Sequence, residues 1–133
     1  MEKNLNLCVG TRIGDWVVCR SDNDSIELFP LVDQTTGNWS TANTFCSNFN
    51  ISPLNGWAVT SSRMPSISDW KNIVSQTGMS GISLTNNSNI WLSDYYNYYY
   101  NDFYAVASHS STYYQSAHDS HGVRPLITIT LIK

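Results

Sequence analysis

The residues best suited to chemistry lie together in the last third of the chain. All three histidines occur there, His109, His118 and His121, with Asp119 between the last two and many serines around them. Histidine and aspartate bind zinc, so His118 and His121 are a candidate metal pair, although no predicted helix would hold them together. The same residue types form hydrolase triads, but no Gly-x-Ser-x-Gly segment presents a nucleophile. We expect no bound metal and no enzymatic activity, and we expect the histidines to be loop residues of a recognition surface.

Every tyrosine of the protein lies in the same region, between Trp91 and Pro125. Tyr98, Tyr99 and Tyr100 are consecutive, and because side chains alternate between the two faces of a strand, they cannot all point into a core. Exposed tyrosine among Ser, Asn, Asp and His is the composition of an antibody binding surface. Tyrosine offers a large contact area with few torsions to fix, and the small polar residues offer adaptable hydrogen bonds. Core packing of the rings and a sticky low-complexity segment are the alternatives.

The predicted ligand-binding residues are Tyr95, Tyr96, Asn97, Tyr98, Tyr99, Tyr100, Asn101, His109, Tyr113, Tyr114, Ser116, His118, Asp119 and His121.

Two other groups of reactive residues are assigned structural roles. The acidic cluster at positions 22–27 lacks the glycine and the spacing of the 12-residue calcium loop, so we predict a solvated turn. Cys8, Cys19 and Cys46 match no zinc or redox motif and are predicted to be small buried apolar residues, with a Cys8–Cys19 disulfide left open. No cofactor is expected.

Arg124 stands before Pro125 in a segment that is otherwise apolar. We predict that its guanidinium is a partly buried anchor paired with a carboxylate such as Asp69 or Asp94. A solvated position at a strand edge is the alternative.

Length and charge limit the classes of protein. A chain of 133 residues is expected to form a single ligand-binding domain, residues 1–133. Charged residues make up 13%, about half the usual ~25%, so Asn, Ser, Thr and Tyr must cover the surface. The net charge of -3 has the wrong sign for phosphate, so no nucleic acid partner is expected. No segment approaches the ~20 apolar residues of a membrane span, and the first residues form no signal peptide, so no membrane insertion is expected.

Two helices are predicted between strand-forming ends. The first covers 41–49, where apolar residues recur at helical spacing, with Ser40 as its N-cap. The second begins with a capping box, in which Ser66 and Asp69 each bond the other's backbone amide, and ends at Gly78.

The strands are predicted from β-forming residues and alternation. Pro30 is expected to put its strand at a sheet edge or to end it, and 51–65 and 79–89 are expected to be loops. The C-terminal segment alternates Ile and Thr, which predicts a strand with one buried face. The fold class is therefore predicted as α+β, with two helices and a small, mostly antiparallel sheet. The predicted strands lie at 13–20, 26–32, 90–93, 103–107 and 122–133.

A series of short motifs follows the order found in one family. They are Trp39-Ser40-Thr41-Ala42 leading into Phe45-Cys46-Ser47, Gly56-Trp57, Met64-Pro65-Ser66 with Asp69-Trp70, Ile90-Trp91-Leu92-Ser93, and Gly122-Val123-Arg124-Pro125. Over about residues 14 to 132 the chain resembles the variable proteins of diversity-generating retroelements. It departs from their pattern in the stretched segment from Gly56 to Ser66 and in Leu92, which stands within a Trp-Ser-Ser motif.

The composition of the tyrosine region adds to the resemblance. In that family, adenines of a template are replaced, so AAY asparagine codons become Tyr, Ser, Asp, His, Thr, Phe, Ala or Val, but never Lys, Glu, Trp or Met. Residues 94–121 follow this rule except at Gln115.

The resemblance implies a C-type-lectin-like fold that displays a hypervariable surface diversified by a retroelement. It implies a receptor-binding or adhesion role on a phage virion or a bacterial cell surface, with a protein or cell-surface ligand. The calcium motifs of animal lectins are missing. An enzyme resembling the formylglycine-generating enzymes is an alternative, although these need late cysteines, and a structural pilus or tail subunit is another.

Overall fold

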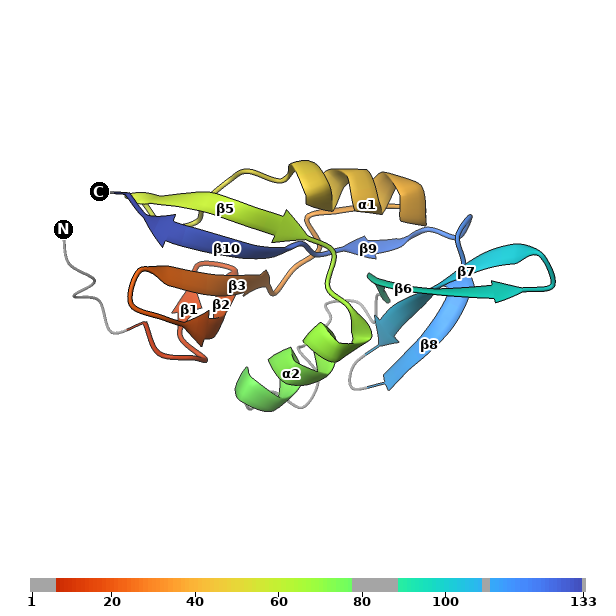
Figure 1. Cartoon of the computed structure of the whole chain (residues 1–133), viewed down its shortest axis with the longest axis horizontal. Coiled ribbons are helices and arrows are strands. Elements are labelled where there is room, and N and C mark those ends of the chain that lie inside the picture. The colour runs from red at the N-terminus through yellow and green to blue at the C-terminus, as the bar shows by residue number, and fades with distance from the viewer. Residues whose placement is uncertain (1–6, 78–88, 109–110, 133) are drawn as a thin grey trace.

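The computed structural model of the protein describes residues 7–77, 89–108 and 111–132. It contains two sheets of five strands each and two helices (Figure 1). The helices are α1 (Trp39–Asn48) and α2 (Ile67–Thr77), which lie on opposite sides of the strands in this view.

The first sheet has the strand order β1-β2-β3-β10-β5, and all its neighbouring strands are antiparallel. Its members are β1 (Arg12–Ile13), β2 (Trp16–Ser21), β3 (Ser25–Pro30), β10 (Leu126–Leu131) and β5 (Trp57–Arg63). Strand β10, which lies between β3 and β5, buries Ile127 and Ile129 and leaves Thr128 and Thr130 partly exposed, as the Ile-Thr alternation predicts.

The second sheet has the order β4-β9-β6-β7-β8, in which only the β9–β6 pair is parallel. Its members are β4 (Thr35–Gly37), β9 (His121–Val123), β6 (Ile90–Tyr98), β7 (Asn101–Ser108) and β8 (Ser111–Ser116). Strands β6, β7 and β8 extend away from the rest of the molecule, on the side opposite the end of β10 (Figure 1).

The predicted α+β class with one small sheet is wrong, although the number of helices is right. The protein is mostly β, with 50% strand and 18% helix, and its strands form two sheets. The segment 57–63 was expected to be a loop but is strand β5. Its backbone, including that of its Ser and Thr residues, pairs with the edge of β10 that β3 does not occupy. This architecture does not by itself show the C-type-lectin-like fold that the resemblance implies.

The helix starts agree in part with the predictions. The capping box of α2 is confirmed: the Asp69 amide donates to Ser66 Oγ over 3.0 Å, and the Ser66 amide donates to Asp69 Oδ2 over 2.8 Å. The N-cap of α1 is Asn38 rather than Ser40, because the Asn38 carboxamide oxygen accepts from the Thr41 amide at 2.9 Å. Gly78, the predicted end of α2, lies outside the described residues.

Three other local predictions are corrected or refined. Pro30 ends β3, but this strand lies between β2 and β10 and not at an edge. The predicted C-terminal strand is divided into β9 and β10, because Pro125 has no amide to donate to a sheet. Cys19 forms no disulfide, so the Cys8–Cys19 bridge is excluded. The loop predicted at 79–89 lies, apart from Asn89, outside the described residues.

Candidate recognition surface

The protruding strands β6, β7 and β8, here called the tyrosine ribbon, carry all eight tyrosines of the protein on themselves or on the turn between β6 and β7. Seven of them are exposed by at least 37%. Elsewhere in the described residues, the only large apolar side chains with comparable exposure are Val9, Ile51 and Ile132. Exposed aromatic area is therefore concentrated in the ribbon, as the composition predicts.

Two tyrosines form the tip of the ribbon. Tyr98 pairs with Asn101, which leaves Tyr99 and Tyr100 as a two-residue hairpin turn. Both have positive φ, 49° and 64°, as the primed turns of tight hairpins require. Asn-Gly is the usual choice there, and positive φ is an outlier for a bulky residue. The Tyr99 ring is 75% exposed and packs edge-on against Tyr98, with ring centroids 4.4 Å apart. The Tyr100 ring is 98% exposed, so packing against the described residues does not explain a tyrosine at that position.

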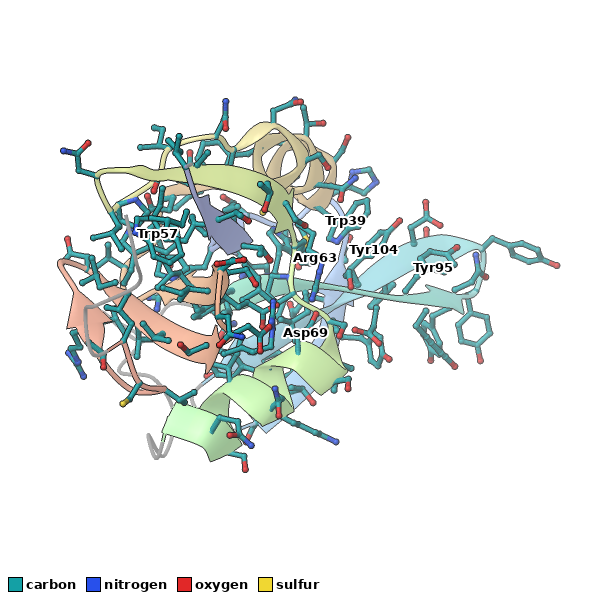
Figure 2. The ribbon with its side chains drawn as sticks, turned by 60° about the vertical axis from the view of Figure 1, so that its left-hand side comes forward. Trp39, Trp57, Arg63, Asp69, Tyr95 and Tyr104 are labelled. Carbon is teal, nitrogen blue, oxygen red and sulfur yellow. The ribbon has the colours of Figure 1, made fainter. Side chains whose placement is uncertain are left out.

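One face of the ribbon continues the core beneath α1. Tyr104 stacks on Trp39 with ring centroids 3.7 Å apart, and Tyr95 packs against Tyr104 at 5.2 Å, so the three rings form a row leading away from the helix (Figure 2). The Tyr95 hydroxyl bonds Asp102 Oδ1 at 2.7 Å and accepts from Asn97 Nδ2 at 3.1 Å. Polar groups of this face are thus oriented by one another before any ligand binds.

The opposite face, on the side of α2, is aromatic. Tyr96 lies 5.6 Å from Tyr114 and 6.1 Å from Tyr98, measured between ring centroids, and Tyr98 lies 5.8 Å from Phe103. These four rings line an open cavity of about 310 Å³ whose walls are almost entirely apolar.

The predicted site residues therefore do not form a single continuous surface. Strand register places Tyr95, Asn97 and Tyr113 on the α1 side, and it places Tyr96, Tyr98, Asn101, Tyr114 and Ser116 on the α2 side. The physical reason is that neighbouring residues of a strand point to opposite faces, so a run of consecutive tyrosines is divided between them.

Neither His118 nor His121 lines this aromatic cavity. His118 and Asp119 lie exposed in the turn after β8, and His109 lies outside the described residues. His121 packs edge-on against Trp91, with ring centroids 4.7 Å apart. Burial lowers the pKa of His121, an effect that the charge of Asp119 opposes, and its Nε2 atom is buried without a hydrogen-bond partner. Within the described residues, no three His, Cys, Asp or Glu side chains are grouped as a metal site would require.

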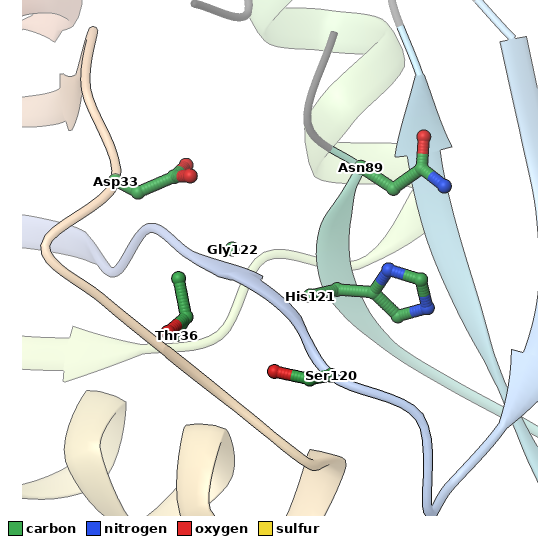
Figure 3. Close-up of a pocket in the computed structure, with 6 residues that line it drawn as sticks. All are labelled: Asp33, Thr36, Asn89, Ser120, His121 and Gly122. Atoms are coloured by element: carbon green, nitrogen blue, oxygen red, sulfur yellow. The ribbon is translucent and has the colours of Figure 1, made fainter. Parts of the chain in front are cut away.

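A second cavity, of about 300 Å³ and mostly polar, lies beside His121 at the base of the ribbon (Figure 3). Asp33 and Thr36 line it from the β4 side, while the His121 ring is directed away from Asp33. Asp33 has a structural role, because its Oδ1 accepts a hydrogen bond from Arg124 Nε at 2.8 Å. A side chain at Gly122 would approach the Asp33 carboxylate to 2.5 Å, so glycine is required there.

Arg124 is the buried anchor that the sequence predicts, with a different partner. Its side chain is fully buried and pairs with Asp33, not with Asp69 or Asp94. Asp69 pairs with Arg63, and Asp94 Oδ1 accepts from the Ile67 amide at the start of α2. Burial lowers the pKa of Arg124, and the bond and charge of Asp33 oppose that change.

Phe103 and Trp39 contribute to the two faces of the ribbon, but neither is among the binding residues predicted from the sequence. Phe103 was assigned only to a strand, although it belongs to the same restricted alphabet as the tyrosines and lies directly opposite Tyr96. Trp39 is 65 residues from its partner Tyr104, so no local signal connects the two rings.

No model of a known protein family matches the chain, and no curated protein matches it either. Among the described residues, no helix has both the length and the apolar character needed to cross a bilayer.

Proposed function

We propose that the protein binds a protein or cell-surface ligand through the tyrosine ribbon and serves as a receptor-binding or adhesion module of a phage virion or a bacterial cell surface. The observation that carries this proposal is the exposure of seven of eight tyrosines on one protruding element. Monomeric proteins rarely expose that much aromatic surface without a binding role. Tyrosine is also enriched in the residues that dominate binding energy.

We further propose that a diversity-generating retroelement varies the ribbon. Residues of the restricted alphabet, which covers 94–121, occupy the exposed positions of the ribbon. Trp91, Leu92 and Arg124 lie just outside that range and are buried. Among the described residues from 94 to 121, only the small residues Ala105, Val106 and Ala107 are fully buried. Variable side chains would thus change the surface while the core contacts beneath the ribbon stay the same.

One observation and one experiment bear on the alternative functions. An enzyme resembling the formylglycine-generating enzymes would use reactive cysteines, but burial raises the pKa of both Cys19 and Cys46 to about 12. A pilus or tail subunit would cover its tyrosines with further copies, and hence would assemble in solution. A monomer at micromolar concentration in analytical ultracentrifugation would contradict that alternative.

A display library tests the binding surface. Tyr95, Tyr96, Tyr98, Tyr100 and Tyr114 would be randomised among Tyr, Ser, Asn, Asp and His, and the library selected against hen egg lysozyme as an arbitrary protein target. We expect folded binders at a frequency well above that of a control library. The control randomises five exposed positions of the first sheet and α1 with the same alphabet. Equal yields from both libraries, or general unfolding of the ribbon library, would refute the proposal.

The genomic context tests diversification separately. We expect a reverse transcriptase gene near the coding sequence and a near-repeat of the region coding for residues 91–125 that differs from it only at adenines. Absence of the repeat from a complete genome would refute diversification, while the binding proposal would still depend on the display experiment.

A further inference from the structure

The aromatic cavity on the α2 side of the ribbon has the features of a small-ligand site. Its lining consists of Tyr96 and Tyr98 from β6, Phe103 from β7 and Tyr114 from β8. Its volume of about 310 Å³ is at the lower end of the range of ligand pockets. A cavity of this size fits one small group, such as a headgroup or a single side chain, rather than a large molecule.

The charge around the cavity favours a cation. Aromatic rings present a negative electrostatic face, which attracts a cation lying over the ring. Residues 90–120 contain no Lys or Arg. Asp94 of β6 accepts a hydrogen bond from the Ile67 amide of α2, and Asp102 of β7 lies on the α1 face, where it bonds Tyr95, so both add negative charge to the ribbon without lining the cavity. The ring faces and the charge of the ribbon therefore both attract positive charge, and the described residues of the ribbon offer no basic side chain that would compete for the rings.

The shortage of polar atoms in the walls selects among cations. A primary ammonium has three N–H donors and a guanidinium has five, and each donor that leaves water needs an acceptor. The walls of this cavity provide almost none. A quaternary ammonium has no N–H group, so it loses no hydrogen bond on entering. We propose that the cavity binds a quaternary ammonium group such as the trimethylammonium head of choline, an inference that rests on the proposed function of the ribbon as a ligand-binding surface.

Titration of the whole protein with choline tests this inference. At constant ionic strength, calorimetry or the NMR signals of the tyrosine rings should show saturable binding with a Kd of roughly 1–10 mM, as expected for a few ring contacts. Two probes serve as controls. The neutral isostere 3,3-dimethyl-1-butanol keeps the shape without the charge, and protonated ethanolamine keeps the charge but has N–H donors. Each should bind at least about tenfold more weakly than choline.

Matched variants locate the site. A Tyr96→Leu/Tyr98→Leu double variant keeps apolar bulk but removes two rings, and it should weaken choline binding about tenfold. Tyr95→Leu is the control, because Tyr95 is exposed to the same degree as Tyr98, 51% against 49%, but lies on the opposite face. This control should bind choline as the unmodified protein does. Thermal unfolding of each variant verifies that it is folded.

Several results would overturn the inference. Equal binding of choline and dimethylbutanol would make the cavity a plain apolar groove. Absence of saturation by choline at 50 mM, or equal loss in Tyr95→Leu, would exclude the site. Failure of choline binding together with successful selection of lysozyme binders would leave the proposed function intact, and the reverse result would refute the proposed function but not the cation site.

Discussion

Replacing Tyr100 with glycine is expected to stabilise the protein, because the native backbone at this position suits glycine better than tyrosine. Tyr100 has φ 64° and is 98% exposed, so its ring has almost no contact to lose. A non-glycine residue in the left-handed region costs roughly 1–2 kcal/mol. The greater freedom of glycine in the unfolded chain takes back roughly 0.4–1 kcal/mol. The net gain in unfolding free energy is therefore about 0.5–1 kcal/mol, or roughly 2–5 °C in Tm.

Urea denaturation followed by tryptophan fluorescence measures this change. Tyr100→Gly should raise the midpoint at an unchanged slope. Tyr100→Ala, which keeps a Cβ atom in the same conformation, should shift the free energy by only a few tenths of a kcal/mol. Tyr113→Gly, in the extended strand β8, should lower it by about 1 kcal/mol. A fall in the midpoint for Tyr100→Gly as large as that for Tyr113→Gly would show that the turn is not left-handed and refute the reasoning.

Three further perturbations test the fold around the ribbon. Asp33→Ala should lower the unfolding free energy by about 3 kcal/mol in urea denaturation, since it leaves the buried Arg124 without its counter-charge; an unchanged midpoint would contradict this. Ser66→Ala should cost about 1 kcal/mol through the lost cap of α2, against almost nothing for the exposed control Ser68→Ala. Burial lowers the pKa of His121, so as the pH falls the unfolded chain takes up a proton at this histidine before the folded protein does. The contribution of His121 to the unfolding free energy should therefore be fully present above the unfolded pKa of ~6.5 and decline as the pH falls from there towards the folded pKa. A His121→Gln variant should show a smaller decline in Tm between pH 7.5 and 5.5, and an equal decline would exclude this histidine as the cause.

The parts of the fold that the sequence predicts correctly depend on local rules. The capping box at Ser66 and Asp69 involves residues three apart, so its two hydrogen bonds follow from the sequence alone. The alternation from Ile127 to Thr130 likewise predicts which side chains of β10 are buried. In both cases the physical interaction lies within one turn of helix or one strand.

The missed parts depend on contacts between distant residues or on atypical turn chemistry. Arg124 and Asp33 are 91 residues apart, so no local rule connects them, and the partners predicted from the sequence were Asp69 and Asp94 instead. The turn formed by Tyr99 and Tyr100 has no glycine or asparagine, the residues that normally indicate a tight hairpin turn. The ribbon was therefore predicted as short strands joined by loops, and the division of its tyrosines between two faces could not be foreseen.

Strand β8 lies at the outer edge of its sheet, and within the described residues it pairs only with β7. It has six residues, with no proline and no charged side chain. Such an edge can pair with the same edge of another molecule and begin aggregation. Substitutions that make the ribbon more apolar would promote this association before they changed the fold. We therefore expect the Asp, Asn, Ser and His residues around the tyrosines to raise the concentration at which the protein stays in solution.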